Sequence, residues 1–322
     1  MKKIGLALGG GFARGFAHIG VLKELKKNNI PIHYIAGTSA GAIIGAAYAC
    51  GFEPEEIEGM ALSIDYLGLF DFTVPDQGLI LSTNIEKFLG YFTKDKNFNQ
   101  TRIPLSIVAT NLDTGGRVVF NKGNIVEAVM ASISVPGVFP PVRKGKYRYV
   151  DGGVTDPVPV DLVKEMGADI IIGVDLSIDV KQRYPKGKET NFLKAVKTKF
   201  LHHQIGYVKE KIKKKQFRVP KILWIPLRLF ARILLRPDKV IKIIGNMFSR
   251  ISAPEMLNSM YRSLTIGQNE LIKAKLKNAK PDIIIKPKFV GIRYAEFDLA
   301  KRGIKEGQRV TRNEIKNIKR LI

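Results

Sequence analysis

Gly37-Thr38-Ser39-Ala40-Gly41 is the stretch from which the fold can be predicted, because it joins two segments of different character. The residues before it, 34–36, end a short apolar run typical of a buried strand, and the residues after it, 42–50, have a helical pattern. A G-x-S-x-G sequence between a strand and a helix is the context that a nucleophile elbow requires. The alternative is an ordinary glycine-rich turn in which Ser39 caps the helix.

Strand and helix patterns alternate on both sides of this stretch. Short apolar runs bounded by Gly, Pro or Asp predict strands at 3–8, 33–37, 105–110, 117–120, 170–175 and 282–285. Helical patterns lie between several of them, for example at 15–28, 40–50 and 159–166. This alternation predicts an α/β fold with a mostly parallel central sheet covered by helices on both faces.

A second glycine-rich motif, Gly9-Gly10-Gly11-Phe12-Ala13-Arg14-Gly15, also follows a strand and precedes a helix. Consecutive glycines allow backbone N–H groups to converge on an anion, either a phosphate or the oxyanion of an ester transition state. Dinucleotide binding requires G-x-G-x-x-G and an acidic residue about 20 positions later. Neither is present, since the glycine spacing differs and the second strand ends at 37–39 without an acid. Nucleotide binding therefore stays a minor alternative.

A nucleophilic Ser39 needs a base, and none of the four histidines is well placed for this role. His33 begins the strand that ends at Ser39 and should lie a strand's length away, at roughly 3.3 Å per residue. His18 lies on the helix after the glycine motif, where a packed side chain is the simpler interpretation. Only His202 and His203 follow the order serine, acid, histidine, and both lie in a strongly basic segment.

Asp151 is the candidate carboxylate. In Asp151-Gly152-Gly153 it follows a strand-like run at 147–150, although an Asp before two glycines is also a common turn. A free Asp is a weak base with a pKa of ~3.9. Asp151 could therefore act only if it were desolvated and hydrogen-bonded directly to Ser39.

Positive charge is concentrated in one part of the chain. The 322 residues contain 53 Lys and Arg against 29 Asp and Glu, which gives a net charge of +24 and favours an anionic partner. Residues 181–250 hold 20 of these basic residues against three acidic ones. We therefore predict a core domain of residues 1–180 and 251–322, interrupted by a basic and mainly helical insertion at 181–250.

The insertion has two amphipathic patterns. In 226–236 an arginine recurs every four residues, and 239–251 repeats a narrow basic stripe against a wide apolar face. Such helices suit the interface of an anionic bilayer, with Trp224 at the headgroup level. The alternatives are a helical pair packed on the domain with solvated lysines, or a nucleic-acid surface, for which the apolar faces are too wide.

Cysteine content and hydropathy bear on the compartment. Cys50 is the single cysteine, so no intrachain disulfide can form, which fits a reducing compartment, and we find no metal-ligand spacing. Residues 1–8 imitate a signal peptide, but their apolar run is too short. No segment approaches the ~20 apolar residues of a transmembrane helix. We expect a cytoplasmic protein, peripheral on the cytoplasmic face of the membrane and not secreted by a cleaved signal peptide.

Together the motifs are similar to those of the patatin-like phospholipase family, in particular its bacterial serine acyl hydrolases. That family pairs a glycine-rich loop with a G-x-S-x-G serine and an Asp in a later D-G-G or D-G-A. This sequence matches in order at 9–15, 37–41 and 151–153, and residues 134–141 and 78–80 are similar too. The similarity covers about 4–175 and, weakly, 264–297. It implies a three-layer α/β/α sandwich.

The resemblance implies a role for each matching residue. Ser39 would be the nucleophile and Asp151 the single base of a dyad. Arg14 would brace the glycine loop or meet a substrate phosphate. Backbone N–H groups of Gly9, Gly10 and Gly11 would bind the oxyanion, and Gly15 would belong to the same oxyanion and substrate-binding loop. The motifs would be supported by Gly37, Gly41, Gly152 and Gly153. One departure is Asp156, where bacterial members often have Asn; this acid could shift the pKa of Asp151 or cap a turn.

We therefore predict a lipid acyl hydrolase of the phospholipase A or lysophospholipase type that works through an acyl-enzyme and needs no metal or cofactor. Its substrate would be a phospholipid or lysophospholipid and its partner an anionic membrane surface; no nucleic acid is expected. The sequence indicates no oligomeric state. The main alternative is a catalytically silent membrane-binding or scaffold protein with the same fold, which hydrolysis of a short-chain nitrophenyl ester would distinguish.

Overall fold

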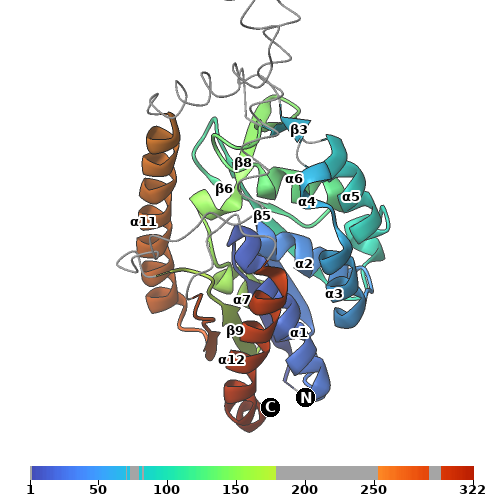
Figure 1. Ribbon diagram of the computed structural model, residues 1–322. Helices are drawn as coiled ribbons and strands as arrows, with labels where there is room; N and C mark the ends of the chain where they lie inside the picture. Colours follow the sequence, from blue (N-terminus) through green and yellow to red (C-terminus); the bar gives the residue numbers. More distant parts are fainter. Residues whose placement is uncertain (1, 70, 73–79, 82, 179–252, 290–298) are drawn as a thin grey trace, which may run out of the picture.

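The computed structural model describes residues 2–69, 71–72, 80–81, 83–178, 253–289 and 299–322. The predicted insertion at 181–250, with its amphipathic segments, Trp224, His202 and His203, lies outside the described residues. Figure 1 shows the described part as a central sheet with helices on both sides. Both termini lie at the same end of the molecule (Figure 1).

The central sheet has eight strands in the order β10-β9-β1-β2-β5-β8-β7, with β6 paired to β5 outside this path. The strands are β1 (Ile4–Leu8), β2 (Tyr34–Thr38), β5 (Leu105–Asn111), β6 (Arg117–Phe120), β7 (Val142–Lys144), β8 (Tyr147–Asp151), β9 (Ile170–Val174) and β10 (Ile283–Ile285). From β10 to β5 all neighbours are parallel, whereas β6 and β8 run antiparallel to β5 and β7 runs antiparallel to β8. The sheet is therefore mixed. A separate two-stranded sheet pairs β3 (Asp71–Phe72) with β4 (Ile80–Leu81).

The helices surround this sheet. They are α1 (Phe16–Lys27), α2 (Ala40–Ala49), α3 (Pro54–Ser63), α4 (Tyr66–Leu69), α5 (Thr83–Thr93), α6 (Ile125–Ile133), α7 (Val160–Glu165), α11 (Ala253–Ala279) and α12 (Ala300–Leu321), with the short 3-10 turns η1 (Phe12–Gly15), η2 (Phe98–Gln100) and η3 (Gly152–Val154). None of the helices described here is both long and apolar enough to cross a membrane. All six strands and all three helices named from the sequence are present, with bounds that differ by at most one residue at each end.

Side chains that alternate along the strands explain the layers. In β1, Leu6 and Leu8 enter one apolar cluster with α1, α2 and α6, while Ala7 enters another with α7 and Ile272 of α11. In β9, Ile172 and Ile171 divide in the same way. Because successive side chains of a strand point to opposite faces, each central strand is buried on both sides. The fold is a three-layer α/β/α sandwich, which confirms the predicted class.

The segments before and after residues 179–252 share one core. β10 pairs in parallel with β9, and α12 packs along α1. The two helices touch at Gly20 and Gly307, where an added Cβ would overlap the carbonyl oxygen of Ile304 or of Ala17. Glycine at both positions therefore allows the helix backbones to meet.

Candidate active site

Ser39 lies at the sharp turn between β2 and α2. Its backbone has φ 53° and ψ −120°, a left-handed conformation that a non-glycine residue seldom adopts. Its amide donates to Ser132 Oγ at 2.8 Å, and Ser132 Oγ in turn donates to the carbonyl of Val108 at 2.6 Å. The Ser39 side chain makes no hydrogen bond to the end of α2. The Ser39 hydroxyl is therefore free to bond to a group outside α2.

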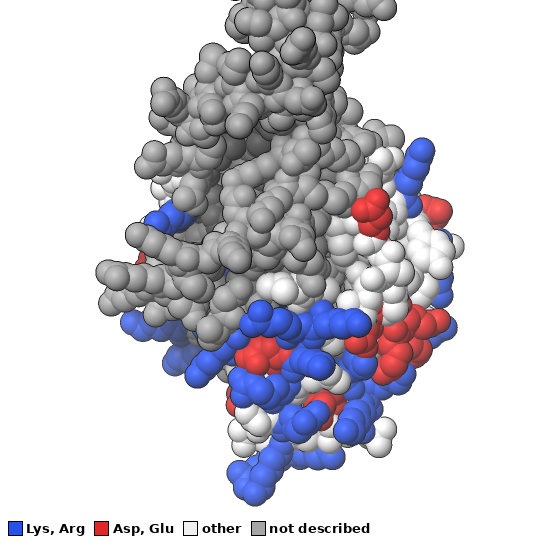
Figure 2. All heavy atoms as spheres, viewed as in Figure 1, with Lys and Arg blue, Asp and Glu red and all other residues white. Residues whose placement is uncertain are grey.

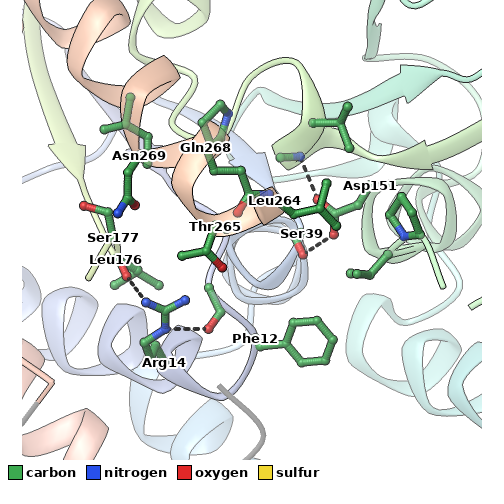
Figure 3. Close-up of a pocket in the computed structure, with 18 residues that line it drawn as sticks. Phe12, Arg14, Ser39, Asp151, Leu176, Ser177, Leu264, Thr265, Gln268 and Asn269 are labelled. Atoms are coloured by element: carbon green, nitrogen blue, oxygen red, sulfur yellow. Dashed lines mark hydrogen bonds between the residues drawn. The ribbon is translucent and has the colours of Figure 1, made fainter. Parts of the chain in front are cut away.

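That partner is Asp151, the last residue of β8. Ser39 Oγ donates to Asp151 Oδ2 at 2.6 Å, and the Gly153 amide donates to Asp151 Oδ1 at 2.6 Å (Figure 3). The Asp151 amide is fixed as well, since it donates to the carbonyl of Ser134 at 2.9 Å. Both oxygens of the carboxylate and its backbone are thus held in place.

Burial gives Asp151 the basicity that a free aspartate lacks. Asp151 is 4% exposed, and burial raises the pKa of its carboxyl to about 6, although hydrogen bonds from Ser39 and Gly153 lower it. An acid with this pKa is ionised at neutral pH and is a stronger base than a free Asp. The two conditions set from the sequence, desolvation and a direct bond to Ser39, are therefore both present.

The two described histidines bond to the backbone and not to Ser39. His18 Nε2 lies 2.7 Å from the carbonyl oxygen of Gly9, and burial lowers the pKa of His18 to about 4. The ring is therefore neutral, and Nε2 carries the proton because a carbonyl only accepts. His33 Nδ1 accepts from the Ile4 amide at 2.9 Å, at the far end of the sheet. As predicted, His33 lies a strand's length from Ser39.

In the glycine loop, not all of the amides that were expected to bind a ligand are free to do so. The Gly9 amide donates to the carbonyl of Val174 at 3.1 Å, and the Gly10 amide donates to that of Pro157 at 2.9 Å. These bonds fasten the loop to the last residue of β9 and to the segment that follows η3, so neither amide is available to a ligand. The expectation that both would bind an oxyanion is therefore corrected. Among the described residues, the Gly11 amide donates no hydrogen bond, and Gly11 lines the pocket.

Arg14 braces this loop, which is the first of its two expected roles. It is 7% exposed, and its guanidinium donates from Nε to the Gly11 carbonyl at 3.2 Å and from Nη1 to the Leu176 carbonyl at 2.8 Å. The remaining motif glycines lie away from the pocket, at positions where neighbouring atoms leave no room for a Cβ: Gly15, Gly37, Gly41 and Gly152.

The pocket over Ser39 has a wall that the sequence motifs do not include. This wall comes from α11, a helix far along the chain from the three motifs (Figure 3). The pocket is lined by Gly10, Gly11, Phe12, Arg14, Ser39, Val135, Pro136, Asp151, Gly153, Val154, Pro157, Leu176 and Ser177, and from α11 by Leu264, Thr265, Gln268, Asn269 and Ile272. Within the described residues, no three His, Cys, Asp or Glu side chains form a group that could hold a metal ion.

The sequence is similar to proteins of one known family. Residues 6–164 match the family of patatin-like phospholipases. These residues form a patatin-like phospholipase domain. An uncharacterized NTE family protein of Mycobacterium tuberculosis is 35% identical over 178 residues, which are 54% of this chain and 49% of that protein. Lysophospholipase nte1 of Aspergillus fumigatus is 32% identical over 185 residues, which are 55% of this chain and 12% of that protein.

The chain thus spans half or less of the length of these curated relatives. Among solved structures, VipD from Legionella pneumophila aligns with 98% of this chain and 67% of its own, at 13% identity and a TM-score of 0.44.

Asp156 of the patatin-like domain has neither of the roles expected from the sequence. Its carboxylate is fully buried between two cations, with Oδ2 at 2.9 Å from Arg117 Nη1 and Oδ1 at 2.9 Å from Lys275 Nζ. Burial raises the pKa of Asp156, while Lys275 and Arg117 lower it. The side chain therefore anchors α11, which carries Lys275, instead of capping a turn or titrating with Asp151.

Proposed function

We propose that the protein is a lipid acyl hydrolase of the phospholipase A or lysophospholipase type, with Ser39 as nucleophile and Asp151 as its base. The observation that carries the proposal is the 2.6 Å hydrogen bond between Ser39 Oγ and a buried carboxylate, at a strained elbow in a pocket. Membership in the patatin-like phospholipase family supports a lipid ester as the substrate. One relative is named a lysophospholipase.

In the acylation step, the acyl group moves from the alcohol of the ester to Ser39, and Asp151 carries the proton between them. Asp151 Oδ2 takes the proton of Ser39 Oγ as that oxygen attacks the ester carbonyl carbon, and the carbonyl electron pair moves to its oxygen. The Gly11 amide and the first amides of α2 would donate to this oxyanion. When the tetrahedral centre collapses, the alcohol leaves with the proton from Asp151. Ser39 then holds the acyl group as an ester.

Deacylation repeats these steps with water. Asp151 takes a proton from a water molecule, whose oxygen attacks the acyl-enzyme carbonyl. Collapse returns the proton to Ser39 Oγ and releases the fatty acid. Because one carboxylate serves in both halves, its pKa of about 6 suits a group that must accept and return a proton near neutral pH.

The decisive experiment replaces the nucleophile. Ser39→Ala should fold normally and lose nearly all turnover of a short-chain nitrophenyl ester, since loss of a nucleophile can cost roughly a millionfold in kcat. A fluorophosphonate probe should label Ser39 in the wild type and nothing in the variant. Ser63→Ala is the control, because this serine is exposed and its hydroxyl donates to the carbonyl of Met60 in its own helix. Labelling elsewhere, or substantial turnover by Ser39→Ala, would overturn the assignment.

We also propose an anionic membrane as the site of action, because lipid substrates lie in bilayers and the chain is strongly basic. Besides residues 181–250, the outer face of α12 is basic, and Lys and Arg gather on the lower part of the view in Figure 2. The exposed basic residues of α12 are Lys301, Arg302, Lys305, Arg309, Arg312, Lys316, Lys319 and Arg320.

Co-sedimentation with vesicles at low and high salt tests this partner. Binding should require anionic lipid and weaken with salt, since each basic residue near the surface contributes about 1 kcal/mol. Changing Arg228, Arg232, Arg236 and Lys242 to Gln should reduce binding, while turnover of a soluble ester should persist. The same change at Lys301, Lys305, Lys316 and Lys319 removes equal charge from α12, so the larger loss of binding identifies which basic segment contacts the membrane. Equal binding to neutral and anionic vesicles would exclude the membrane as the reason for the charge.

A further inference from the structure

The two sides of the pocket differ in chemistry. Phe12, Val135 and Pro136 are apolar, and Val135 packs against the cluster on the α1 and α6 face of the sheet. The opposite side comes from α11, whose Ile272 belongs to the cluster on the α7 face. Figure 3 shows Thr265, Gln268 and Asn269 of α11 together with Ser177 on that side, and Phe12 across from them. Ser39 lies between this apolar side and the α11 side, which presents these polar groups beside the apolar Leu264 and Ile272.

Cationic groups also lie on the polar side. Lys286 Nζ donates to Ser177 Oγ at 2.9 Å and to Asp175 Oδ2 at 2.6 Å. Arg14 contacts the same segment through the carbonyl of Leu176. Two of the lining residues are charged, Asp151 and Arg14. An ester whose alcohol part carries oxygen atoms, neutral or phosphorylated, suits this side, and an acyl chain suits the other.

Gln268 is a polar group of α11 that lies beside the turn after Asp151. A Cβ added at Gly153 would lie 2.7 Å from Gln268 Nε2 and 2.9 Å from Asp151 Oδ1, so the amide lies beside the turn that holds the base. Asn269 already donates to the carbonyl of Ile178 at 2.7 Å. By contrast, the Gln268 amide makes no hydrogen bond within the described part of the chain. It can therefore both donate to and accept from a bound molecule.

The position of α11 relative to Ser39 is fixed by Asp156. The Asp156 carboxylate pairs with Lys275 on α11, and its backbone belongs to the site, because its carbonyl accepts from Thr38 Oγ1 at 2.8 Å. Its amide donates to the Gly152 carbonyl at 2.8 Å. One residue thus contacts the elbow, the turn after the base and the helix that carries Gln268. Such an anchor holds a specificity group in place.

We propose that α11 forms the leaving-group side of the site, where Gln268 hydrogen-bonds the alcohol part of a lipid ester that carries hydroxyl or phosphoryl oxygens. The acyl chain lies on the side of Phe12, Val135 and Pro136. This inference rests on the proposed hydrolase function of Ser39 and Asp151. It assigns the polarity of the two sides and the residue that recognises the leaving alcohol.

The test uses three esters with one acyl chain, so that only the leaving group varies: para-nitrophenyl octanoate, monooctanoylglycerol and octanoyl lysophosphatidylcholine. In the full chain, Gln268→Leu should lower kcat/KM for the glycerol ester about three- to tenfold, the effect of one lost neutral hydrogen bond. The loss for the nitrophenyl ester, whose leaving group offers Gln268 no hydroxyl or phosphoryl oxygen, should be smaller. Asn278→Leu replaces an exposed amide on the same helix outside the pocket and should change none of the three.

Gln268→Glu distinguishes the two kinds of oxygen. Its charge should reduce turnover of the phosphorylated ester far more than that of the glycerol ester if a phosphoryl group is bound, and both alike if a hydroxyl is bound. An equal effect of Gln268→Leu on all three esters, or no effect on any, would overturn the leaving-group assignment. If the wild type cleaves none of the esters, the proposed hydrolase function fails instead.

Discussion

Ser39 and Asp151 are hydrogen-bonded at 2.6 Å although 112 positions separate them in the chain. Their strands reach β5 from opposite directions, with Thr38 of β2 opposite Val108 and Asp151 of β8 opposite Ala109. The pair therefore forms where the parallel part of the sheet meets its antiparallel part. A serine at the end of one strand and a carboxylate at the end of the other meet without a histidine between them.

The pH dependence of hydrolysis should report Asp151. Because the base must be ionised, and burial raises its pKa to about 6, kcat/KM for a soluble ester should rise with pH through about 6 and level off above it. A pH profile of wild type and of His33→Asn, whose histidine lies far from the site, should give the same midpoint. A midpoint near the pKa of a free Asp, ~3.9, would show that the carboxyl is not desolvated in solution.

Asp151→Asn should make the protein more stable while it abolishes activity. The pKa of Asp151 is higher in the folded than in the unfolded state, so the wild type loses stability as pH rises from the unfolded value through about 6. Removing the buried charge should raise the free energy of unfolding above this pH by up to roughly 3 kcal/mol, with no gain near pH ~4.

Urea denaturation at both pH values would measure the difference. Asp113→Asn is the contrasting variant, because Arg148 lowers the pKa of Asp113 and the charged form is the stabilising one. Its effect at neutral pH should have the opposite sign. Equal stability of Asp151→Asn and wild type across the range would contradict the buried, costly charge.

His18 should matter for the glycine loop without acting on the substrate. His18→Phe keeps an aromatic side chain but removes the hydrogen bond to the Gly9 carbonyl, so the loop and the Gly11 amide should lose their fixed position. We expect kcat for a soluble ester to fall about tenfold with little change in KM, since an oxyanion donor acts mainly in the transition state. His33→Phe, which also removes a backbone hydrogen bond, should leave kcat unchanged. A similar loss in both variants would indicate a general effect on folding.

The Asp156–Lys275 pair should behave as a coupled unit. Lys275→Met leaves the buried Asp156 with Arg117 alone and should lower the free energy of unfolding by about 1–3 kcal/mol. Adding Asp156→Asn removes the buried carboxylate charge that no longer pairs with Lys275. The double variant should therefore recover part of the lost free energy of unfolding. Chemical denaturation of the four proteins gives the coupling energy. Additive effects would mean that the two side chains do not interact in solution.

Local signals were sufficient to predict most of the fold. The strands and helices named from the sequence are present because their apolar periods reflect burial on one or two faces. The turn at Ser39 was predictable because small residues between a strand and a helix leave few other conformations. The D-G-G turn was predictable as a candidate because its glycines allow close packing. The division into a core domain and an insertion at 181–250 stays a prediction.

Long-range features had no such signal. Lys275 and Asp156 pair across more than a hundred residues, and neither spacing nor composition marks them. Gln268 lies on α11, where the family resemblance is weak and no motif occurs. The Gly9 and Gly10 amides were expected to face a ligand because a glycine run shows which backbone can approach an anion. It does not show which N–H groups are already bonded to neighbouring strands.

Because β10 and α12 lie more than a hundred residues after β9, they are synthesised well after the rest of the core. Residues 1–178, which leave the ribosome before β10, contain Ser39, Asp151 and the glycine loop, but β9 then has an open edge. The side of α1 around Gly20 is also bare until α12 covers it. A nascent chain must therefore keep an apolar surface from self-association until α12 emerges. A chain that stops before β10 should aggregate instead of folding as a smaller domain.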